Sequence, residues 1–310
     1  MNPDISVIVP VFNEEPCLQE TYEALTAELS KLDLVYELIF VNDGSTDRSE
    51  EIISELKQRD ERVMLFSFSR NFGHEAASSC GFAHCRGRAA ILIDADLQDP
   101  PELIAEMVKK WKEGYEIVAG RRKTREGETL VKKVTSYVFY RVMNLFSEVS
   151  LPRDVGDFRL VDRKVIDNFN NMTEKNRFVR GLFPWLGFNQ YFLEYDRKPR
   201  AGGRSKYNYF RLLFLSFDAI SSFSLAPLRM AVLMGFLVTI FSAIAVFHIV
   251  FQKLVFGIDI PGYAFLTTGV FFLGGVQVFF LGVIGEYVGK IYKEAQGRPL
   301  YILKNGDPEE

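Results

Sequence analysis

Acidic side chains follow the apolar runs in the first third of the chain. Asp43 follows the run YELIFVN, and Asp94 and Asp96 follow the run AAILI. Two residues apart at a strand end, Asp94 and Asp96 are expected to point their carboxylates the same way. Mg²⁺ binds oxygen ligands and typically uses one or two carboxylates together with substrate phosphates. A D-x-D pair is common on protein surfaces, but its place directly after an apolar strand favours a site where Mg²⁺ or Mn²⁺ holds a diphosphate.

Other phosphate-binding motifs are absent from the sequence. No G-x-G-x-x-G follows a predicted strand and no G-x-x-x-x-G-K-[ST] occurs, which excludes the dinucleotide-binding and P-loop classes. The cysteines Cys17, Cys80 and Cys85 lack the spacing of a zinc site or of a disulfide framework. They are interpreted as small buried residues.

The acidic residues need a scaffold that brings strand ends together. Short β-branched or aromatic runs predict strands at 6–10, 36–41, 63–68, 89–93 and 116–119. Helical patterns cover 16–31, 48–59, 75–86 and 101–113, and Asp99 is interpreted as the N-cap of the last. This alternation predicts an α/β fold with a mostly parallel sheet, whose ligands bind beyond the carboxyl ends of the strands.

The composition is that of a folded protein with an unusual last third. The chain has 310 residues and a formal net charge of −3, which gives no reason to expect a nucleic-acid partner. Its hydrophobic content of 48% excludes wholesale disorder. Residues 230–251 and 261–285 contain no Asp, Glu, Lys or Arg. Each stretch exceeds the ~20 residues that a helix needs to cross a bilayer, so two transmembrane helices are predicted.

Basic residues flank these two stretches and predict their orientation. Arg211 and Arg229 precede the first, Lys290 and Lys293 follow the second, and the connection between them offers only Lys253. Because Lys and Arg favour the cytoplasmic side, both termini and the large N-terminal part are predicted to be cytoplasmic. The first residues, MNPDISVIVP, lack the basic region and cleavage site of a secretory signal.

Five motifs occur in the order found in a known family. IVPVFNEE, VNDGSTD, SRNFGHEAA, DADLQDP and DVGDFRL resemble those of the family-2 glycosyltransferases of the GT-A fold. With two carboxy-terminal spans, the chain is most similar to the polyprenyl-phosphate glycosyltransferases, which include bactoprenol glucosyltransferases and dolichyl-phosphate mannose synthases. The Gln-x-x-Arg-Trp motif of processive polysaccharide synthases is absent, and the comparable region has NRFVRGLFPW. Polymer synthesis is therefore discounted.

The resemblance, together with the two apolar stretches, divides the chain into five expected parts. A Rossmann-like GT-A domain is expected over 1–195, and a juxtamembrane interfacial segment over 196–228. Transmembrane helices are expected over 229–252 and 261–288, followed by a cytoplasmic tail over 289–310. The protein is then a multi-pass protein of the bacterial cytoplasmic membrane.

The resemblance also implies roles for individual residues. Contacts to the donor nucleotide fall on Pro10, Phe12, Glu14, Asp43, Gly73 and Asp94. Metal ligands fall on Asp94, Asp96 and Gln98, and the catalytic residues on Asp96 and Asp157. Contacts to the acceptor phosphate fall on Arg122, Lys132, Ser136, Arg204 and Lys206. Asp157 is expected to orient a sugar hydroxyl or a phosphate, with a general base as the alternative, and His74 is given no role.

The implied reaction is the inverting transfer of glucose from UDP-glucose to undecaprenyl phosphate or another polyprenyl phosphate. It takes place at the cytoplasmic membrane face, releases UDP and uses Mg²⁺ or Mn²⁺. The implied partners are thus a UDP-sugar, a polyprenyl phosphate and membrane lipid, without nucleic acid, and a homo-oligomer is left open. GDP-mannose or UDP-modified arabinose are also compatible donors.

Two different functions stay open as well. One is a sugar nucleotidyltransferase, which would carry a glycine-rich loop where PVFNEE stands, and the other is a catalytically silent membrane scaffold.

Overall fold

A mostly parallel sheet organises the N-terminal part of the chain. The computed structural model describes the following residues of the whole chain: 3–123, 152, 155–175, 177–196, 226–256 and 262–306. Within these residues seven strands have the order β3-β2-β1-β4-β6-β5-β7. They are β1 (Ile5–Val11), β2 (Tyr36–Asn42), β3 (Val63–Ser67), β4 (Ala89–Leu92), β5 (Ile117–Arg122), β6 (Val155–Asp162) and β7 (Gln190–Tyr195). β6 runs antiparallel to β4 and β5, and the other neighbours pair in parallel. The predicted α/β fold is confirmed.

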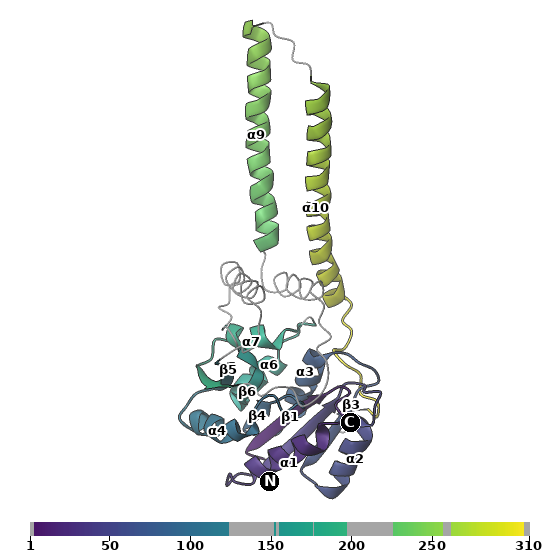
Figure 1. Ribbon diagram of the computed structural model, residues 1–310, viewed down its shortest axis with the longest axis vertical. Helices are drawn as coiled ribbons and strands as arrows, with labels where there is room; N and C mark the ends of the chain where they lie inside the picture. The colour runs from purple at the N-terminus through teal and green to yellow at the C-terminus, as the bar shows by residue number, and fades with distance from the viewer. Residues whose placement is uncertain are drawn as a thin grey trace.

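Helices cover both faces of the sheet (Figure 1). They are α1 (Leu18–Leu29), α2 (Ser49–Arg59), α3 (His74–His84), the short η1 (Pro101–Leu103), α4 (Ile104–Lys112), α6 (Arg163–Asn170) and α7 (Val179–Trp185). Because successive side chains of a strand point to opposite faces, Val7 and Val9 pack with Leu18 of α1, whereas Ile8 packs with Phe82 of α3. All of these side chains are fully buried, as expected for a sheet covered on both sides.

The direction of β6 decides what meets at the carboxyl edge of the sheet. Leu92 at the end of β4 lies opposite Arg159 in the middle of β6, and the residues of β6 before Arg159 come after this pairing along the direction of β4. The start of β6 therefore lies beside the end of β4. β5 and β7 run parallel to each other and antiparallel to β6, so Arg122 and Tyr195 end at the same edge.

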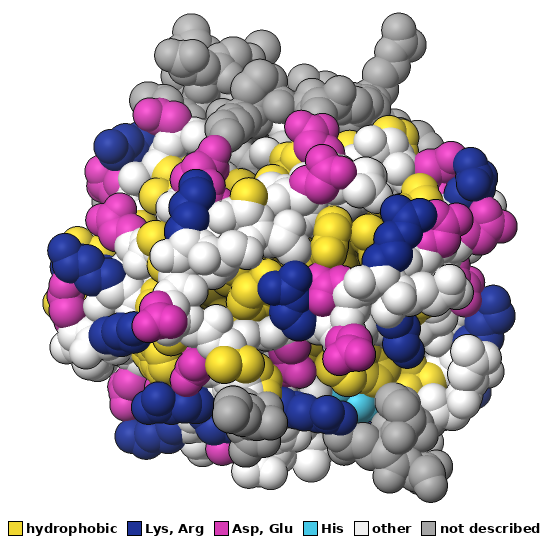
Figure 2. All heavy atoms as spheres, turned by 90° about the horizontal axis from the view of Figure 1, so that it is seen from below, with side chains coloured by type: hydrophobic (Ala, Val, Ile, Leu, Met, Phe, Trp, Pro, Cys, Tyr) yellow, Lys and Arg dark blue, Asp and Glu magenta, His cyan; other side chains and the backbone are white. Residues whose placement is uncertain are grey.

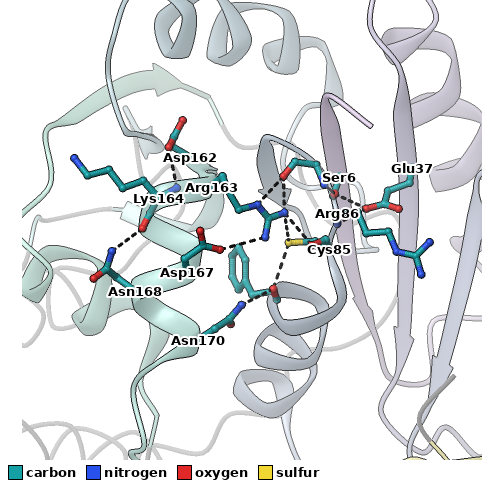
Figure 3. Close-up of polar contacts among 12 residues, drawn as sticks. Ser6, Glu37, Cys85, Arg86, Asp162, Arg163, Lys164, Asp167, Asn168 and Asn170 are labelled. Atoms are coloured by element: carbon teal, nitrogen blue, oxygen red, sulfur yellow. Dashed lines mark hydrogen bonds and ion pairs between the residues drawn. The ribbon is translucent and has the colours of Figure 1, made fainter. Parts of the chain in front are cut away.

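The opposite, amino-terminal edge holds a closed polar network (Figure 3). The Ser6 hydroxyl donates to Glu37 Oε1 at 2.6 Å and accepts from the Gly87 N–H at 2.8 Å. Glu37 Oε1 also accepts from the Arg86 N–H at 2.7 Å. From α6, the Arg163 guanidinium points into the turn between α3 and β4, where its Nε donates to the Gly87 carbonyl at 2.9 Å. These hydrogen bonds connect the turn before β4 to β1, β2 and α6.

Two long helices, α9 (Ala226–Phe256) and α10 (Tyr263–Ala295), run side by side away from the sheet (Figure 1). Among the described residues, the segment Gly269–Ala295 is long and apolar enough to cross a membrane, and Ala231–Ala245 is a shorter apolar helix. Large side chains on both helices are exposed, including Phe241 at 73% and Phe271 at 76%. One apolar candidate span is thus confirmed, and the pair of transmembrane helices stays a prediction.

The face of the domain opposite to α9 and α10 is charged with both signs (Figure 2). Lys and Arg side chains are interspersed with Asp and Glu, and apolar side chains show between them in small areas. A mixed surface of this kind is typical of a face that contacts water.

Candidate active site

Acidic and basic side chains from separate elements converge beyond the end of β4. Asp94 and Asp96 follow that strand, Asp157 lies near the start of β6, His74 begins α3 and Arg180 lies in α7. His74 Nε2 lies 3.9 Å from Asp94 Oδ1 and 3.5 Å from Asp157 Oδ2. The structure thus brings two predicted site residues, Asp94 and Asp157, into contact with one imidazole nitrogen.

The D-x-D pair lies in a turn and not in a strand. β4 ends at Leu92, and Ala95 and Asp96 form a turn. The expectation that strand alternation orients both carboxylates is therefore wrong, and the turn sets their directions. Leu97 in this turn has φ = 53°, in the left-handed region that costs a branched side chain on the order of 1–2 kcal/mol. Backbone strain of this kind is concentrated at functional sites.

Gln98, the third predicted metal ligand, supports this turn through its backbone. Its N–H donates to Asp96 Oδ1 at 3.2 Å, which fixes one oxygen of that carboxylate. Asp96 is 8% exposed, so this carboxylate is nearly buried. A side-chain contact from Gln98 to a metal stays a prediction.

Two arginines hold Asp157 in different ways, one through its carboxylate and one through its backbone. Arg180 grips its carboxylate with both prongs of the guanidinium, the Nε at 2.8 Å from Oδ1 and the Nη2 on Oδ2. Arg159 is buried and supports the backbone instead, with its Nη2 2.7 Å from the Gly156 carbonyl and its Nε 3.2 Å from that of Asp157. Asp157 is therefore fixed in position and already paired with a cation.

The pKa values of this cluster follow from burial and charge. Burial by itself would raise the Asp157 pKa, but hydrogen bonds from Arg180 and His74 hold that pKa well below its usual range. Burial would lower the His74 pKa, but the hydrogen bond to Asp157 and the charge of Asp94 raise it to about 9. Burial raises the Asp94 pKa to about 6; His74 opposes this shift, and the carboxylates of Asp157, Asp99 and Asp96 add to it. At neutral pH His74 is a cation between two carboxylates.

Asp43 positions the loop that leads into α3. Its buried carboxylate accepts hydrogen bonds from the N–H groups of Phe72 at 2.6 Å and Gly73 at 2.9 Å, and from the Asn71 amide at 2.9 Å. Burial raises the Asp43 pKa, and the two backbone hydrogen bonds oppose that shift. Gly73 has φ = 103°, which L residues rarely adopt, and α3 begins directly after it with His74. Asp43 thus places His74, and its predicted contact to a nucleotide base stays a prediction.

A pocket of about 460 Å³ opens at the carboxyl ends of β1, β2 and β3. Its lining residues are Phe12, Gly44, Ser45, Thr46, Glu50, Phe68, Ser69, Arg70, Asn71 and Lys304. Phe12, predicted to contact the donor, is 45% exposed at this pocket. Gly44 has φ = 64°, and a Cβ there would lie 2.4 Å from the backbone carbon of Arg70. Only glycine therefore allows the β2 and β3 loops to approach each other here.

The other two predicted donor residues on β1 and its following loop do not line this pocket. Pro10 is buried in β1, opposite Val41 of β2. Glu14 lies before α1, and its N–H donates to the Ser49 hydroxyl at 3.1 Å. Contacts from Pro10 and Glu14 to a nucleotide stay predictions.

On the acceptor side the structure describes one of the five predicted residues. Arg122 ends β5, and its Nε, like that of Arg121, is buried with no hydrogen-bond partner among the described residues. Lys132, Ser136, Arg204 and Lys206 lie outside the residues that the structure describes.

Asp99 is not the helix N-cap that the sequence suggested. The cap position before η1 is Pro100, and no side chain caps that helix. Asp99 is 1% exposed and accepts a hydrogen bond from the Tyr195 hydroxyl. The N-cap interpretation failed because it considered only local residues, whereas the end of β7 brings Tyr195 to this edge.

The residues after β4 fit a divalent cation. Asp94 and Asp96 carry carboxylate oxygens of the kind that a divalent cation prefers. Burial raises the Asp94 pKa, and the nearby carboxylates of Asp157, Asp99 and Asp96 raise it further, a crowding that a positive charge would relieve. Among the described residues, no three His, Cys, Asp or Glu side chains form a complete ligand set. A divalent cation at this place would therefore need substrate oxygens and water to complete its coordination, as is usual for Mg²⁺.

Two members of the cluster, His74 and Arg180, were not predicted. His74 precedes a helical pattern, where a structural role is common. Arg180 lies in NRFVRGLFPW, a stretch considered only as the counterpart of a missing motif. No local pattern pointed to Arg180, because the burial of Asp157 that favours a cationic partner is a property of the folded chain.

The sequence comparisons with known proteins agree on one family. The sequence model described as Glycosyl transferase family 2 matches residues 6–169. An uncharacterized glycosyltransferase of Bacillus subtilis strain 168, YkcC, is 47% identical over 299 residues, which cover 96% of this chain and 93% of that protein. The bactoprenol glucosyl transferase of Shigella phage SfV is 40% identical over 301 residues, which cover 97% of this chain and 98% of that protein. Among solved structures, mannosyl-3-phosphoglycerate synthase from Rubrobacter xylanophilus is 17% identical, with a TM-score of 0.49, and the match covers 70% of this chain and 72% of that one.

Proposed function

Because the chain belongs to glycosyl transferase family 2 and is therefore a glycosyltransferase, we propose that it transfers glucose from UDP-glucose to undecaprenyl phosphate with inversion at the anomeric carbon. The observation that carries this proposal is the cluster of Asp94, Asp96 and Asp157 with Arg180 at the carboxyl edge of the sheet, in a chain that continues into long apolar helices. The bactoprenol glucosyl transferase of phage SfV supports the sugar and the acceptor, since the match to it extends over nearly all of both chains.

The donor diphosphate is proposed to bind beside Asp94 and Asp96. These two residues would hold Mg²⁺ or Mn²⁺, with Gln98 as a further ligand. When bound, the cation neutralises the diphosphate and stabilises the leaving UDP as a Lewis acid. The nucleoside would extend into the pocket beside Phe12, with Asp43 holding the adjacent loop.

Asp157 is proposed to orient groups and not to remove a proton. A phosphate monoester has a second pKa near 6 and is largely dianionic at neutral pH, so the attacking acceptor has little need of a general base. Arg180 donates hydrogen bonds to both oxygens of the Asp157 carboxylate. This pairing stabilises the charged form and leaves the carboxylate poorly placed to accept a proton. Its role would be to hold Arg180 and His74 where negative charge develops.

The acceptor phosphate needs cations that offset its repulsion from the donor diphosphate. Arg122 is proposed as one of these cations. It is the last residue of β5, at the same edge of the sheet, and its Nε is buried. Lys132, Ser136, Arg204 and Lys206 stay predictions for the same phosphate. The helices α9 and α10 are proposed to cross the membrane as a hairpin with both termini cytoplasmic. This arrangement would keep the polyprenyl chain in lipid while its phosphate reaches the site.

The test is the transfer of labelled sugar into an organic-extractable lipid. Purified full-length protein in detergent would be mixed with undecaprenyl phosphate, Mg²⁺ or Mn²⁺, and a panel of UDP- and GDP-sugars. We expect labelled lipid from UDP-glucose that is lost with EDTA and in Asp96→Asn. Asp33→Asn, which neutralises an exposed aspartate outside the site, is the matched control and should retain activity.

Different functions give different results in this assay. Transfer from GDP-mannose or a UDP-arabinose derivative alone would keep the reaction and change the donor. Formation of a nucleotide-sugar from a sugar phosphate and UTP would support a nucleotidyltransferase. No transfer and no metal-dependent binding of UDP would favour the silent scaffold and contradict the proposal.

A further inference from the structure

The segment after α10 returns to the sheet and pairs with its edge. The Ser69 N–H donates to the Ile302 carbonyl at 2.9 Å, and the Lys304 N–H donates to the Ser67 carbonyl at 2.8 Å. Between these bonds Phe68 and Leu303 form an antiparallel bridge. The residues Tyr301–Lys304, called here the tail segment, therefore extend the sheet beyond β3.

Side chains fix the tail segment as well. The Tyr301 ring stacks on Phe68, with centroids 4.9 Å apart and planes 10° from parallel. Lys304 Nζ lies 3.2 Å from Glu50 Oε2, at the start of α2. At the foot of α10, the Glu294 carboxylate accepts from the Lys175 N–H at 2.9 Å. The chain is thus anchored on the domain both before and within the tail segment.

The tail segment borders the pocket described above. Phe68 and Ser69, to which it pairs, line the pocket together with Lys304 itself. The other walls come from the ends of β1 and β2 and from the β3–α3 loop, so residues from both ends of the chain surround one volume. The charged lining residues are Arg70, Lys304 and Glu50, which leave a net positive charge and favour an anionic ligand.

We propose that the tail segment is a wall of the donor-nucleotide pocket, and that Lys304 sets the affinity for the nucleoside diphosphate. This inference rests on the proposed function, because it takes the pocket beside Phe12 as the place of the nucleotide. The exposed Phe12 ring suits the planar base of such a ligand, and the net positive charge of the pocket favours its anionic diphosphate, which is proposed to lie beside Asp94 and Asp96. The donor site is then complete only when the segment that follows α10 is seated on β3.

The competing explanation is that the tail segment covers an edge strand and does nothing else. β3 is the edge of the sheet, and unpaired edges are commonly covered. The two explanations differ in what a change at Lys304 does. A mere cover predicts lower thermal stability with unchanged nucleotide affinity, whereas a pocket wall predicts weaker nucleotide binding at unchanged kcat.

The experiment measures UDP binding by calorimetry with Mg²⁺ or Mn²⁺, and the KM for UDP-glucose, on the full chain in detergent. Lys304→Ala should weaken UDP binding and raise the KM about fivefold, the effect of losing one solvent-exposed charged contact, with kcat unchanged. Lys304→Arg, which keeps the charge, should restore most of the affinity. Tyr301→Ala, which removes the ring stacked on Phe68, should also weaken UDP binding.

Arg298→Ala is the matched control, because it removes one positive charge from the same stretch outside the pocket and should bind UDP like the wild type. Wild-type UDP affinity in both Lys304→Ala and Tyr301→Ala would overturn the tail inference and leave the proposed function intact. Wild-type protein that binds neither UDP nor GDP would overturn the proposed function and the inference with it. A lower Tm at unchanged affinity would show an edge cover only.

Discussion

At the amino-terminal edge of the sheet, the buried carboxylate of Glu37 accepts hydrogen bonds from Ser6 and from the backbone of Arg86. At the carboxyl-terminal edge, Asp94 shares its surroundings with three other carboxylates and one imidazole. The same sheet therefore holds a network whose polar groups satisfy one another and a cluster with an excess of negative charge. The first arrangement favours stability, and the second favours binding a cation together with its ligand.

A comparison of the two edges shows that burial of an acidic side chain does not by itself indicate a functional site. Glu37 and Asp96 are equally buried, each 8% exposed. They differ in their partners, since Glu37 joins strands through neutral donors, whereas the acids near Asp94 repel one another. A cluster that is strained without its ligand is expected where binding supplies the missing stabilisation.

Replacing Asp96 should have the largest effect on activity. Asp96→Asn removes one of two carboxylates at the proposed metal site and should lower kcat/KM on the order of 1,000-fold, similar to the loss of a main electrostatic contact in other enzymes. Thermal unfolding should show a stability equal to or above that of the wild type, because crowding by like charges is relieved. Activity of Asp96→Asn close to that of the wild type would contradict the metal assignment.

Replacing Asp157 should have the next largest effect. Asp157→Asn retains the shape of the side chain but weakens its grip on Arg180, so we expect a loss of turnover on the order of 100-fold with the fold intact. The measurement is a steady-state assay of transfer together with a circular dichroism spectrum. Wild-type rates in this variant would exclude both the orienting role and the general base.

Gly44, which lines the proposed nucleotide pocket, tests the geometry of that pocket. Gly44→Ala would place a Cβ 2.4 Å from the backbone of Arg70, in a conformation with φ = 64°. We expect a cost of about 1–3 kcal/mol, visible as a lower Tm and as a raised KM for the donor. Gly114→Ala is the control for φ alone, since its φ is 104° and a Cβ there meets nothing within 4 Å. Equal effects on donor KM in the two variants would show that the clash is unimportant.

The smallest effect on turnover is expected at the amino-terminal edge. Ser6→Ala deprives Glu37 and the Gly87 N–H of a partner and should lower the free energy of unfolding by about 1–2 kcal/mol. The kcat and KM of the folded protein should not change, because this edge is remote from the carboxyl ends of the strands. A specific loss of kcat in Ser6→Ala would remove the distinction between the two edges.

Local patterns were sufficient for the first half of the sheet. The runs at 36–41 and 63–68 match β2 and β3 to within one residue, because parallel strands buried on both faces form continuous apolar runs. Asp94 and Asp96 were identified in the same way, by their place after a strand. Neither β6 nor β7 was predicted as a strand, and the position of Asp157 was inferred only from the resemblance to a family.

The α/β class, the acidic residues after β4 and the apolar stretches near the carboxyl end can all be read from the amino-acid sequence. These properties depend on residue type and short-range periodicity, which are present in the chain before it folds. Only the tertiary structure decided that Arg180 binds Asp157, that Tyr195 bonds to Asp99 and that Lys304 reaches the pocket beside Phe12. Each of these contacts joins residues separated along the chain, and the antiparallel β6 and the pairing of the tail segment with β3 bring them together.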